Sequence, residues 1–257
     1  MTAQVLGVIP TRLASTRLPR KPLHPIAGRP LVEWVWRRAV QSGVFDEVVV
    51  ATDSPEVETA ARAFGATVAL TRAGHPSGTD RVAEVARREE WRGYSVIVNV
   101  QGDEPFVRAD HLQAAVELVR AGWEVGTVAT PIASGDEWRE PAVVKVARGD
   151  DGRALYFTRA PVPHPRDAAP DFGSGAYLRH VGVYAYAREA LLRWVALPEG
   201  ALERIEKLEQ LRALAAGLRI GVAVGEPAEG GVDTPADALR AERIILESLA
   251  PPALERA

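Results

Sequence analysis

Residues 4–23 read QVLGVIPTRLASTRLPRKPL, in which an apolar run passes directly into a basic loop. The run Gln4–Pro10 predicts a buried strand. Ligands bind at the carboxyl ends of strands in open α/β sheets, which is where this loop begins. The loop holds four cations and no acid: Arg12, Arg17, Arg20 and Lys21. Guanidinium groups grip phosphate oxygens in pairs and an ammonium adds a point charge, so the loop suits a triphosphate or else is a solvated basic loop.

The rest of the first half alternates apolar strands with helical patterns. The predicted strands are Glu47–Thr52, Thr67–Leu70, Ser95–Gln101 and Glu124–Pro131. The predicted helices are Leu31–Ser42, Pro55–Phe64, Asp80–Glu90 and Asp110–Arg120. Continuous apolar strands separated by helices indicate a mainly parallel sheet that is covered on both faces. Right-handed crossovers then give a doubly wound α/β fold.

The second half is less regular. Two strands, Ala142–Ala147 and Arg153–Phe157, flank a Gly- and Asp-rich turn and predict a hairpin. A loop is expected over residues 160–175. The remaining predicted elements are a strand at Val181–Tyr186, a helix at Glu203–Ala216, a strand at Arg219–Val224 and a closing helix at Pro235–Leu249. No long linker divides the chain, so we expect a single α/β domain over residues 1–257.

The chain has 257 residues, of which 47% are hydrophobic and 25% are charged, with a net charge of −3. This is the composition of an ordinary globular protein, and it argues against a general affinity for nucleic acid. The absence of cysteine excludes disulfides and thiolate metal sites. No apolar run approaches the roughly 20 residues needed to span a bilayer, and the first residues do not read as a signal peptide. We therefore expect a soluble, cytoplasmic protein without nucleic-acid or membrane partners.

A second motif, VNVQGDEP at residues 98–105, is an apolar strand that runs into a polar turn. Gly102 allows a ligand to approach the backbone closely. Asp103 leaves the strand end and is well placed for Mg²⁺, which prefers oxygen ligands. The alternative is a plain tight turn, which is the favoured interpretation of this motif in isolation.

A third motif, GGVDTP at residues 230–235, supplies a distant carboxylate. Asp233 or Thr234 could cap the last helix. Asp233 could instead be the second carboxylate for the metal of Asp103. Spacing in the sequence does not show whether the two side chains meet.

Three further motifs are weaker when taken alone. HPSGTDR at residues 75–81 either caps the following helix or reads a nucleobase edge. LRHVGVYAY at residues 178–186 contains His180, and a buried histidine is more often a satisfied core residue than a catalyst. IEKLEQLR at residues 205–212 contains charges that a solvated helix would also carry.

Taken together and in order, the motifs resemble those of the 3-deoxy-manno-octulosonate (KDO) cytidylyltransferases. The segments that carry the resemblance are IPTRLASTRLPRKPL, VVVATDS, HPSGTDR, VNVQGDEP, AVVKV, ALYFTRAPVP, LRHVGVYAY, LEQLR and GVDTP. Each is moderately specific, and the ordered set spans nearly the whole chain. One departure is Arg20, because the family often has glycine before the motif lysine. Arg20 either points outward or adds a phosphate contact.

The resemblance implies a nucleotide-diphospho-sugar transferase-like fold, with a Rossmann-like, mainly parallel sheet and helices on both faces. It implies a smaller dimerisation and sugar-binding subdomain over residues 135–185, within a homodimer. It also implies Mg²⁺ as cofactor, and CTP and KDO as substrates. The products would be CMP-KDO, for lipopolysaccharide biosynthesis, and pyrophosphate.

Site residues follow from the same resemblance. The triphosphate would contact Arg12, Ser15, Arg17 and Lys21, and the cytosine would face Arg72, Ser77 and Gly78. Gln101 would lie between nucleotide and sugar, and Asp103 and Asp233 would bind Mg²⁺. The sugar acid would contact Arg159, His180, Tyr184, Glu209 and Gln210. The residues expected to act in catalysis are Arg12, Arg17, Lys21, Asp103 and Asp233.

Two other functions stay open. The nearer is a cytidylyltransferase for another acid sugar, such as 8-amino-KDO or an acylneuraminate. The more distant is a non-catalytic protein that senses CTP. The pair of carboxylates argues against a sensor, because a sensor needs no two-carboxylate metal site.

Overall fold

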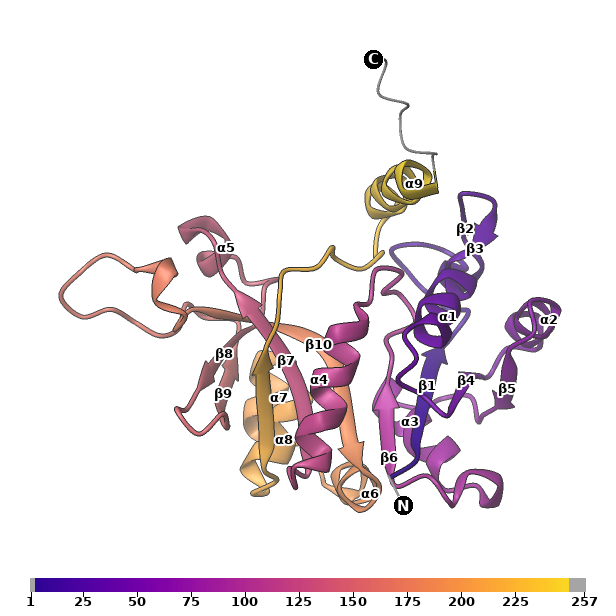
Figure 1. Ribbon diagram of the computed structural model, residues 1–257, viewed down its shortest axis with the longest axis horizontal. Helices are drawn as coiled ribbons and strands as arrows, with labels where there is room; N and C mark the ends of the chain where they lie inside the picture. The colour runs from indigo at the N-terminus through magenta and orange to yellow at the C-terminus, as the bar shows by residue number, and fades with distance from the viewer. Residues whose placement is uncertain (1–2, 250–257) are drawn as a thin grey trace, which may run out of the picture.

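The computed structural model describes residues 3–249 and contains one large mixed sheet flanked by helices (Figure 1). Seven strands lie in the order β11-β7-β10-β6-β1-β4-β5, and β8 and β9 extend the sheet beside β10. The strands are β1 (Val5–Thr11), β4 (Glu47–Thr52), β5 (Thr67–Leu70), β6 (Val96–Asn99), β7 (Val125–Pro131), β8 (Lys145–Arg148), β9 (Ala154–Thr158), β10 (Leu178–Ala187) and β11 (Ile220–Val224). A separate two-stranded sheet pairs β2 (Pro25–Ile26) with β3 (Arg29–Pro30).

The sheet is mainly parallel, as the sequence predicts. Strands β5, β4, β1 and β6 are parallel neighbours, and β11 is parallel to β7. Only β10 runs antiparallel between two strands of the central sheet, β6 and β7. The hairpin predicted in the second half is the antiparallel pair β8–β9.

Helices cover both faces of the sheet, because each presents an apolar stripe to it. One face packs against α1 (Leu31–Gln41), α2 (Pro55–Ala63), α4 (Ala109–Arg120) and α9 (Pro235–Leu249). The other packs against α3 (Gly78–Ala86), α6 (Arg188–Ala196) and α8 (Gln210–Ala215). In α1 the buried stripe is Leu31, Val32, Val35 and Ala39. No helix within residues 3–249 is both long and apolar enough to cross a membrane.

The remaining elements are short: α5 (Gly135–Arg139), α7 (Ala201–Glu206) and the 3-10 turns η1 (Lys21–Leu23), η2 (Glu89–Trp91) and η3 (Phe172–Ser174). Apart from η3, the predicted loop over residues 160–175 has no regular structure. The predicted single helix Glu203–Ala216 is wrong. It is divided into α7 and α8 at Lys207, whose φ of 54° lies in the left-handed region. Two helices, α5 and α6, were not predicted at all.

The binding edge of the sheet follows from its connectivity. From β1 the chain crosses through α1 to β4 on one side, whereas the later strand β6 lies on the other side of β1. Where strand order reverses in this way, the carboxyl ends of the two strands leave a crevice between their loops. The loops that follow β1 and β6 are the ones that carry the basic stretch and the motif VNVQGDEP.

An arm built from α5, β8, β9 and the loop 159–177 projects from the central sheet (Figure 1). Lys145 lies at the base of this arm and has no exposed surface. Its ammonium donates to the carbonyl oxygens of Glu140, Val143 and Arg159 at 2.9, 2.6 and 2.7 Å. Burial lowers the pKa of Lys145, whereas the nearby carboxylates of Glu140 and Glu206 favour its charged form.

We expect Lys145→Met to lower the free energy of unfolding by about 1–3 kcal/mol, because three buried carbonyls lose their donor. Urea denaturation followed by circular dichroism measures the change. Lys207→Met is the matched control, since Lys207 is exposed and should change stability by less than about 0.5 kcal/mol. Equal losses of unfolding free energy in the two variants would contradict a stabilising role for the three hydrogen bonds of Lys145.

Candidate active site

A cavity of about 320 Å³ lies at the carboxyl ends of β1 and β6. Its walls come from the loop after β1, the turn that begins α3, the loop after β6 and the segment before α9. The site residues that line it are Arg12, Ser15, Arg17, Lys21, Ser77, Gly78, Gln101, Asp103 and Asp233. Residues from four distant parts of the chain therefore share one cavity.

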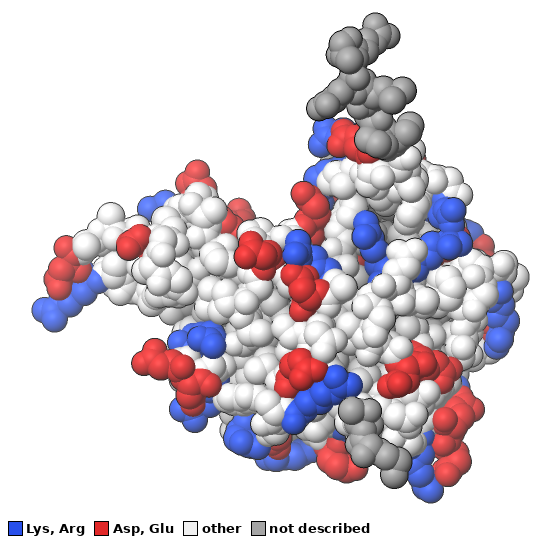
Figure 2. Space-filling view, in the orientation of Figure 1, with Lys and Arg blue, Asp and Glu red and all other residues white. Residues whose placement is uncertain are grey.

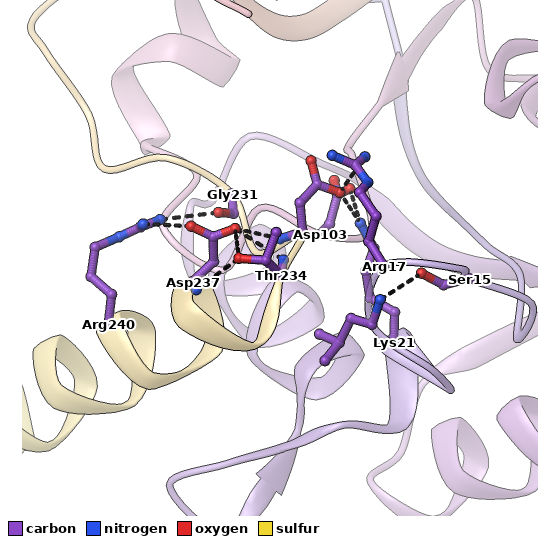
Figure 3. A network of polar contacts seen from close by, with 10 residues as sticks. Ser15, Arg17, Lys21, Asp103, Gly231, Thr234, Asp237 and Arg240 are labelled. Carbon is purple, nitrogen blue, oxygen red and sulfur yellow. Dashed lines mark hydrogen bonds and ion pairs between the residues drawn. The ribbon is translucent and has the colours of Figure 1, made fainter.

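The two aspartates of the metal hypothesis meet at one ammonium group. Lys21 Nζ lies 2.5 Å from Asp103 Oδ2 and 2.8 Å from Asp233 Oδ1 (Figure 3). Arg17 adds a further ion pair to Asp233 Oδ1, at 3.0 Å. The pKa of Lys21 is raised even though burial opposes its charge, because the two carboxylates outweigh that burial.

Backbone contacts bring the two aspartates together. The Val232 amide donates to the Asp103 carbonyl at 2.8 Å, which joins the segment before α9 to the loop after β6. Gly102 and Gly231 permit this approach. A Cβ at Gly102 would lie 2.7 Å from the Pro10 carbonyl oxygen, and one at Gly231 would lie 2.8 Å from a carboxylate oxygen of Glu104.

A second carboxylate network holds Asp233 in place. Asp237, in the first turn of α9, accepts hydrogen bonds from the amides of Asp233 and Thr234 and from the Thr234 hydroxyl, at 3.2, 3.0 and 2.8 Å (Figure 3). Thr234 caps the helix by accepting from the Asp237 amide at 3.2 Å. Arg240 donates to the other oxygen of Asp237 at 2.6 Å. Burial would raise the pKa of Asp237, but these bonds outweigh it and lower the pKa to about 2. The two roles considered for this motif therefore fall to different residues. Thr234 caps the helix, whereas the Asp233 carboxylate points toward Lys21.

The charges of the site are unevenly neutralised. Arg12 lines the cavity and makes no ion pair with any described residue, so its guanidinium is free for an anion. The Ser15 hydroxyl makes a contact within its own loop, because it accepts a hydrogen bond from the Leu18 amide at 3.4 Å. Burial and the neighbouring charge of Asp103 raise the pKa of Glu104 to about 7.

Arg20 points away from the cavity. Its guanidinium pairs with Glu56 in α2, and Arg20 is not part of the cavity wall. Its φ of 57° lies in the left-handed region, which glycine adopts at less cost than any other residue. The backbone at this position would suit glycine, the residue that the resemblance leads one to expect here, and Arg20 is the outward-pointing alternative of the two considered above.

The wall expected to face a nucleobase is built on the first turn of α3. Ser77 caps the helix by accepting from the Asp80 amide at 3.2 Å. Gly78 packs against Pro10, to which a Cβ would approach within 3.4 Å. Arg72 does not join them: its side chain is 78% exposed, lies beside Glu84 and does not line the cavity.

A buried arginine that the sequence did not single out supports this wall. Arg81 is 4% exposed, lines the cavity, and donates to Asp53 at 2.9 Å and to the hydroxyl of Thr71. These bonds tie α3 to the carboxyl ends of β4 and β5. The available signal was its position four residues after the capping serine, which places it on the same side of the helix.

The residues expected at a sugar lie behind that wall. Glu209 accepts from the hydroxyls of Ser77 and Thr79 at 3.2 and 3.1 Å, and its pKa is raised by burial. Gln101 donates to the Gly182 carbonyl at 3.3 Å, so it spans from the cavity to β10. Residues expected at the nucleotide and residues expected at the sugar therefore contact each other directly.

The other residues expected at the sugar are buried or hydrogen-bonded within the protein. Arg159 donates to the carbonyls of Glu206 and Pro141 at 2.8 and 2.9 Å. His180 Nε2 lies 2.9 Å from the Thr127 hydroxyl, and burial lowers its pKa to about 3. Gln210 is 7% exposed, and the buried Tyr184 hydroxyl has no partner among residues 3–249. None of these four residues lines the large cavity, and His180 lines a second, smaller cavity instead.

Glu104 lines a second cavity, of about 80 Å³. Its wall mixes acids and bases, with Glu104 and Glu229 beside Arg108 and Arg179. The guanidinium groups are already paired, with Asp110 at 2.7 Å and Glu137 at 3.3 Å. We assign this cavity no ligand.

The two aspartates of the large cavity could bind a hard divalent cation only if a bound molecule and water supplied further oxygen donors. Within residues 3–249 no cluster of three or more His, Asp and Glu side chains is placed to hold a metal ion. Two carboxylates do converge, and Mg²⁺ is commonly bound by one or two carboxylates, substrate phosphates and water.

A protein family and individual relatives that match this chain are all described as cytidylyltransferases. The family described as Cytidylyltransferase matches residues 6–220. A 3-deoxy-manno-octulosonate cytidylyltransferase of Gemmatimonas aurantiaca is 55% identical over 239 residues, which are 92% of this chain and 92% of the relative. One of Xanthomonas euvesicatoria pv. vesicatoria is 46% identical over 250 residues, covering 93% and 95% of the two chains.

Solved structures agree with these relatives. A CMP:2-keto-3-deoxy-manno-octonic acid synthetase complexed with CTP superposes with a TM-score of 0.89 at 40% identity, over 96% of this chain and all of the other. A 4-diphosphocytidyl-2C-methyl-D-erythritol synthase from Anaerococcus prevotii superposes with a TM-score of 0.62 over 95% of this chain and 99% of the other. At 13% identity that second likeness shows only a shared fold.

We expect Asp237→Asn to destabilise the protein by about 2 kcal/mol at pH 7, because the pKa of Asp237 is lowered from its ordinary value of 3.8 to about 2 in the folded state. A lowered carboxyl pKa stabilises the fold above pH 4, and this contribution is lost as the pH falls through 2. Urea denaturation at pH 7 and near pH 2.5 measures the difference, which should shrink at the lower pH. Asp136→Asn, at an exposed carboxylate, is the control. A difference that does not depend on pH would contradict the role of the charge.

Proposed function

The chain belongs to the family of 3-deoxy-manno-octulosonate cytidylyltransferases, and from this premise we propose that it activates KDO with CTP, giving CMP-KDO and pyrophosphate for lipopolysaccharide biosynthesis. It is a nucleotidyltransferase by its family. The single observation that carries the proposal is the meeting of Asp103 and Asp233 at Lys21, inside a cavity that also holds Arg12 and Arg17.

The triphosphate would bind along the loop after β1. Arg12, Arg17 and Lys21 line one wall of the cavity and can contact phosphate oxygens. The cytosine would lie against Ser77 and Gly78 at the first turn of α3. The exposed position of Arg72 favours a contact at the rim rather than within the wall.

Asp103 and Asp233 would hold Mg²⁺. Both are hard oxygen donors, and the phosphate oxygens of the nucleotide would complete a set of the kind that Mg²⁺ prefers. When bound there, the ion would supply charge neutralisation for the phosphates and polarise an oxygen bound to it.

The residues of the chain would act mainly by positioning and by neutralising charge. The anomeric oxygen of the sugar would form a bond to the α-phosphorus as the bond from that phosphorus to the pyrophosphate oxygen breaks, and the hydroxyl proton would pass to solvent. Arg17 and Lys21 would stabilise the leaving pyrophosphate. Glu209, Gln101 and the side chains near β10 would orient the sugar acid.

The arm within residues 135–185 would serve as the dimerisation and sugar-binding subdomain of a homodimer. Large apolar side chains are exposed within the arm and on α7: Leu155 in β9 is 54% exposed, and Ile205 in α7 is 77% exposed. Burying such side chains against a second copy would stabilise a dimer. Acidic and basic side chains are interspersed on the face shown in Figure 2, which offers no broad basic surface to nucleic acid. A cytoplasmic location would supply the CTP.

The acid sugar is the part of the proposal with a close competitor. We would incubate the enzyme with CTP and Mg²⁺ and with KDO, 8-amino-KDO or N-acetylneuraminate, and measure released pyrophosphate. Release with KDO in preference to the other two supports the proposal. Preference for either other sugar would reassign the substrate, and nucleotide binding without pyrophosphate release would favour the CTP sensor.

We expect Asp103→Asn to lower kcat by about 10²–10³, the usual loss when a group that stabilises transition-state charge is removed. The fold should be unchanged, since the carbonyl of residue 103 still accepts from Val232. Steady-state pyrophosphate release measures the rate, and thermal denaturation checks the fold. Asp110→Asn is the control, because that residue lies outside the large cavity. Near wild-type turnover in Asp103→Asn would exclude the metal role.

A further inference from the structure

Lys21 occupies the position between the two carboxylates that a metal ion would share. Its Nζ is within 2.5 and 2.8 Å of one oxygen of each aspartate. The side chain is only 18% exposed, so the ammonium is held inside the site rather than at its surface. A cation bound by both Asp103 and Asp233 would have to use the oxygens that Lys21 already engages, or lie against its charge.

The two occupants exclude each other electrostatically. Like charges a few ångströms apart in a partly buried site repel by several kcal/mol at an effective dielectric constant near 20. Arg17 increases that repulsion, because it also pairs with Asp233. A divalent ion therefore gains the aspartates only if the ammonium moves.

We propose that Lys21 is a built-in counter-ion that competes with the divalent cation for Asp103 and Asp233, and that the triphosphate releases it. The metal site would then be complete only when nucleotide is bound. This inference rests on the proposed function, since it takes the nucleotide and the metal from there.

The nucleotide has the chemistry to open the site. Arg12, Arg17 and Lys21 line the same cavity, so phosphate oxygens there compete with Asp233 and Asp103 for the cationic groups. The flexible four-carbon stem of lysine lets its ammonium follow the phosphates. The phosphates also add negative charge, which restores the attraction for a cation. Because such coupling is reciprocal, the metal would strengthen nucleotide binding by the same factor.

The loss of metal affinity depends on the fraction of time for which Lys21 is away from the two aspartates. If Lys21 leaves the aspartates about one-tenth of the time, the apparent affinity for the free metal falls about tenfold. Removing the ammonium should recover that factor without any nucleotide.

The test is a titration with Mn²⁺ alone, followed by electron paramagnetic resonance, on the wild type, Lys21→Met and Arg20→Met. Arg20→Met removes a neighbouring charge that pairs with Glu56 instead of the aspartates. We expect Lys21→Met to bind one Mn²⁺ about tenfold or more tightly than the wild type, and Arg20→Met to stay within about twofold. Adding Asp103→Asn to Lys21→Met should abolish the gain, and thermal denaturation confirms that each variant is folded.

Equal Mn²⁺ affinity in the wild type and Lys21→Met would overturn the inference. Equal gains in Lys21→Met and Arg20→Met would also overturn it, because they would reduce the effect to overall charge. A gain that survives Asp103→Asn would place the ion elsewhere and overturn it too. The titration uses no substrate, so its outcome is independent of the pyrophosphate assay that tests the proposed function.

Discussion

The site depends on one electrostatic constraint: two carboxylates held close together need a cation between them. Asp103 and Asp233 come from segments about 130 residues apart, and the hydrogen bond from the Val232 amide to the Asp103 carbonyl joins those segments. Two anions this close would repel each other without a partner. Lys21 supplies that partner from a third segment, so the loop after β1, the loop after β6 and the start of α9 are fixed by the same three charges.

The residues expected to contact the nucleotide and those expected to contact the sugar are joined by direct hydrogen bonds. Ser77, at the cavity wall, donates to Glu209, which lies at the junction of α7 and α8. That junction exists because Lys207 interrupts the helix with a left-handed backbone conformation. A continuous helix over Glu203–Ala216 would place Glu209 elsewhere. The helix break at Lys207, which the periodicity of the sequence did not predict, therefore directs the Glu209 carboxylate toward the first turn of α3.

Most of the fold could be predicted from the sequence because it rests on local patterns. The strand Glu47–Thr52 is a continuous apolar run with the same bounds in the structure, and the closing helix begins at Pro235 as predicted. The motifs suggested which residues share the site, but periodicity cannot show that Asp103 and Asp233 meet. The support of Asp237 for Asp233 and of Arg81 for the α3 wall was also out of reach, since both depend on contacts between side chains. Arg20 shows the opposite case: its direction was undecidable from the motif and follows at once from its backbone conformation and from Glu56.

Crystals grown with CTP and Mn²⁺ would test whether Asp103 and Asp233 form one cation site beside the triphosphate, because manganese can be located by its anomalous scattering. We expect an anomalous peak in contact with carboxylate oxygens of both residues and with phosphate oxygens, and we expect Lys21 to be displaced toward the phosphates. A peak that contacts neither carboxylate, with Lys21 still between them, would contradict it.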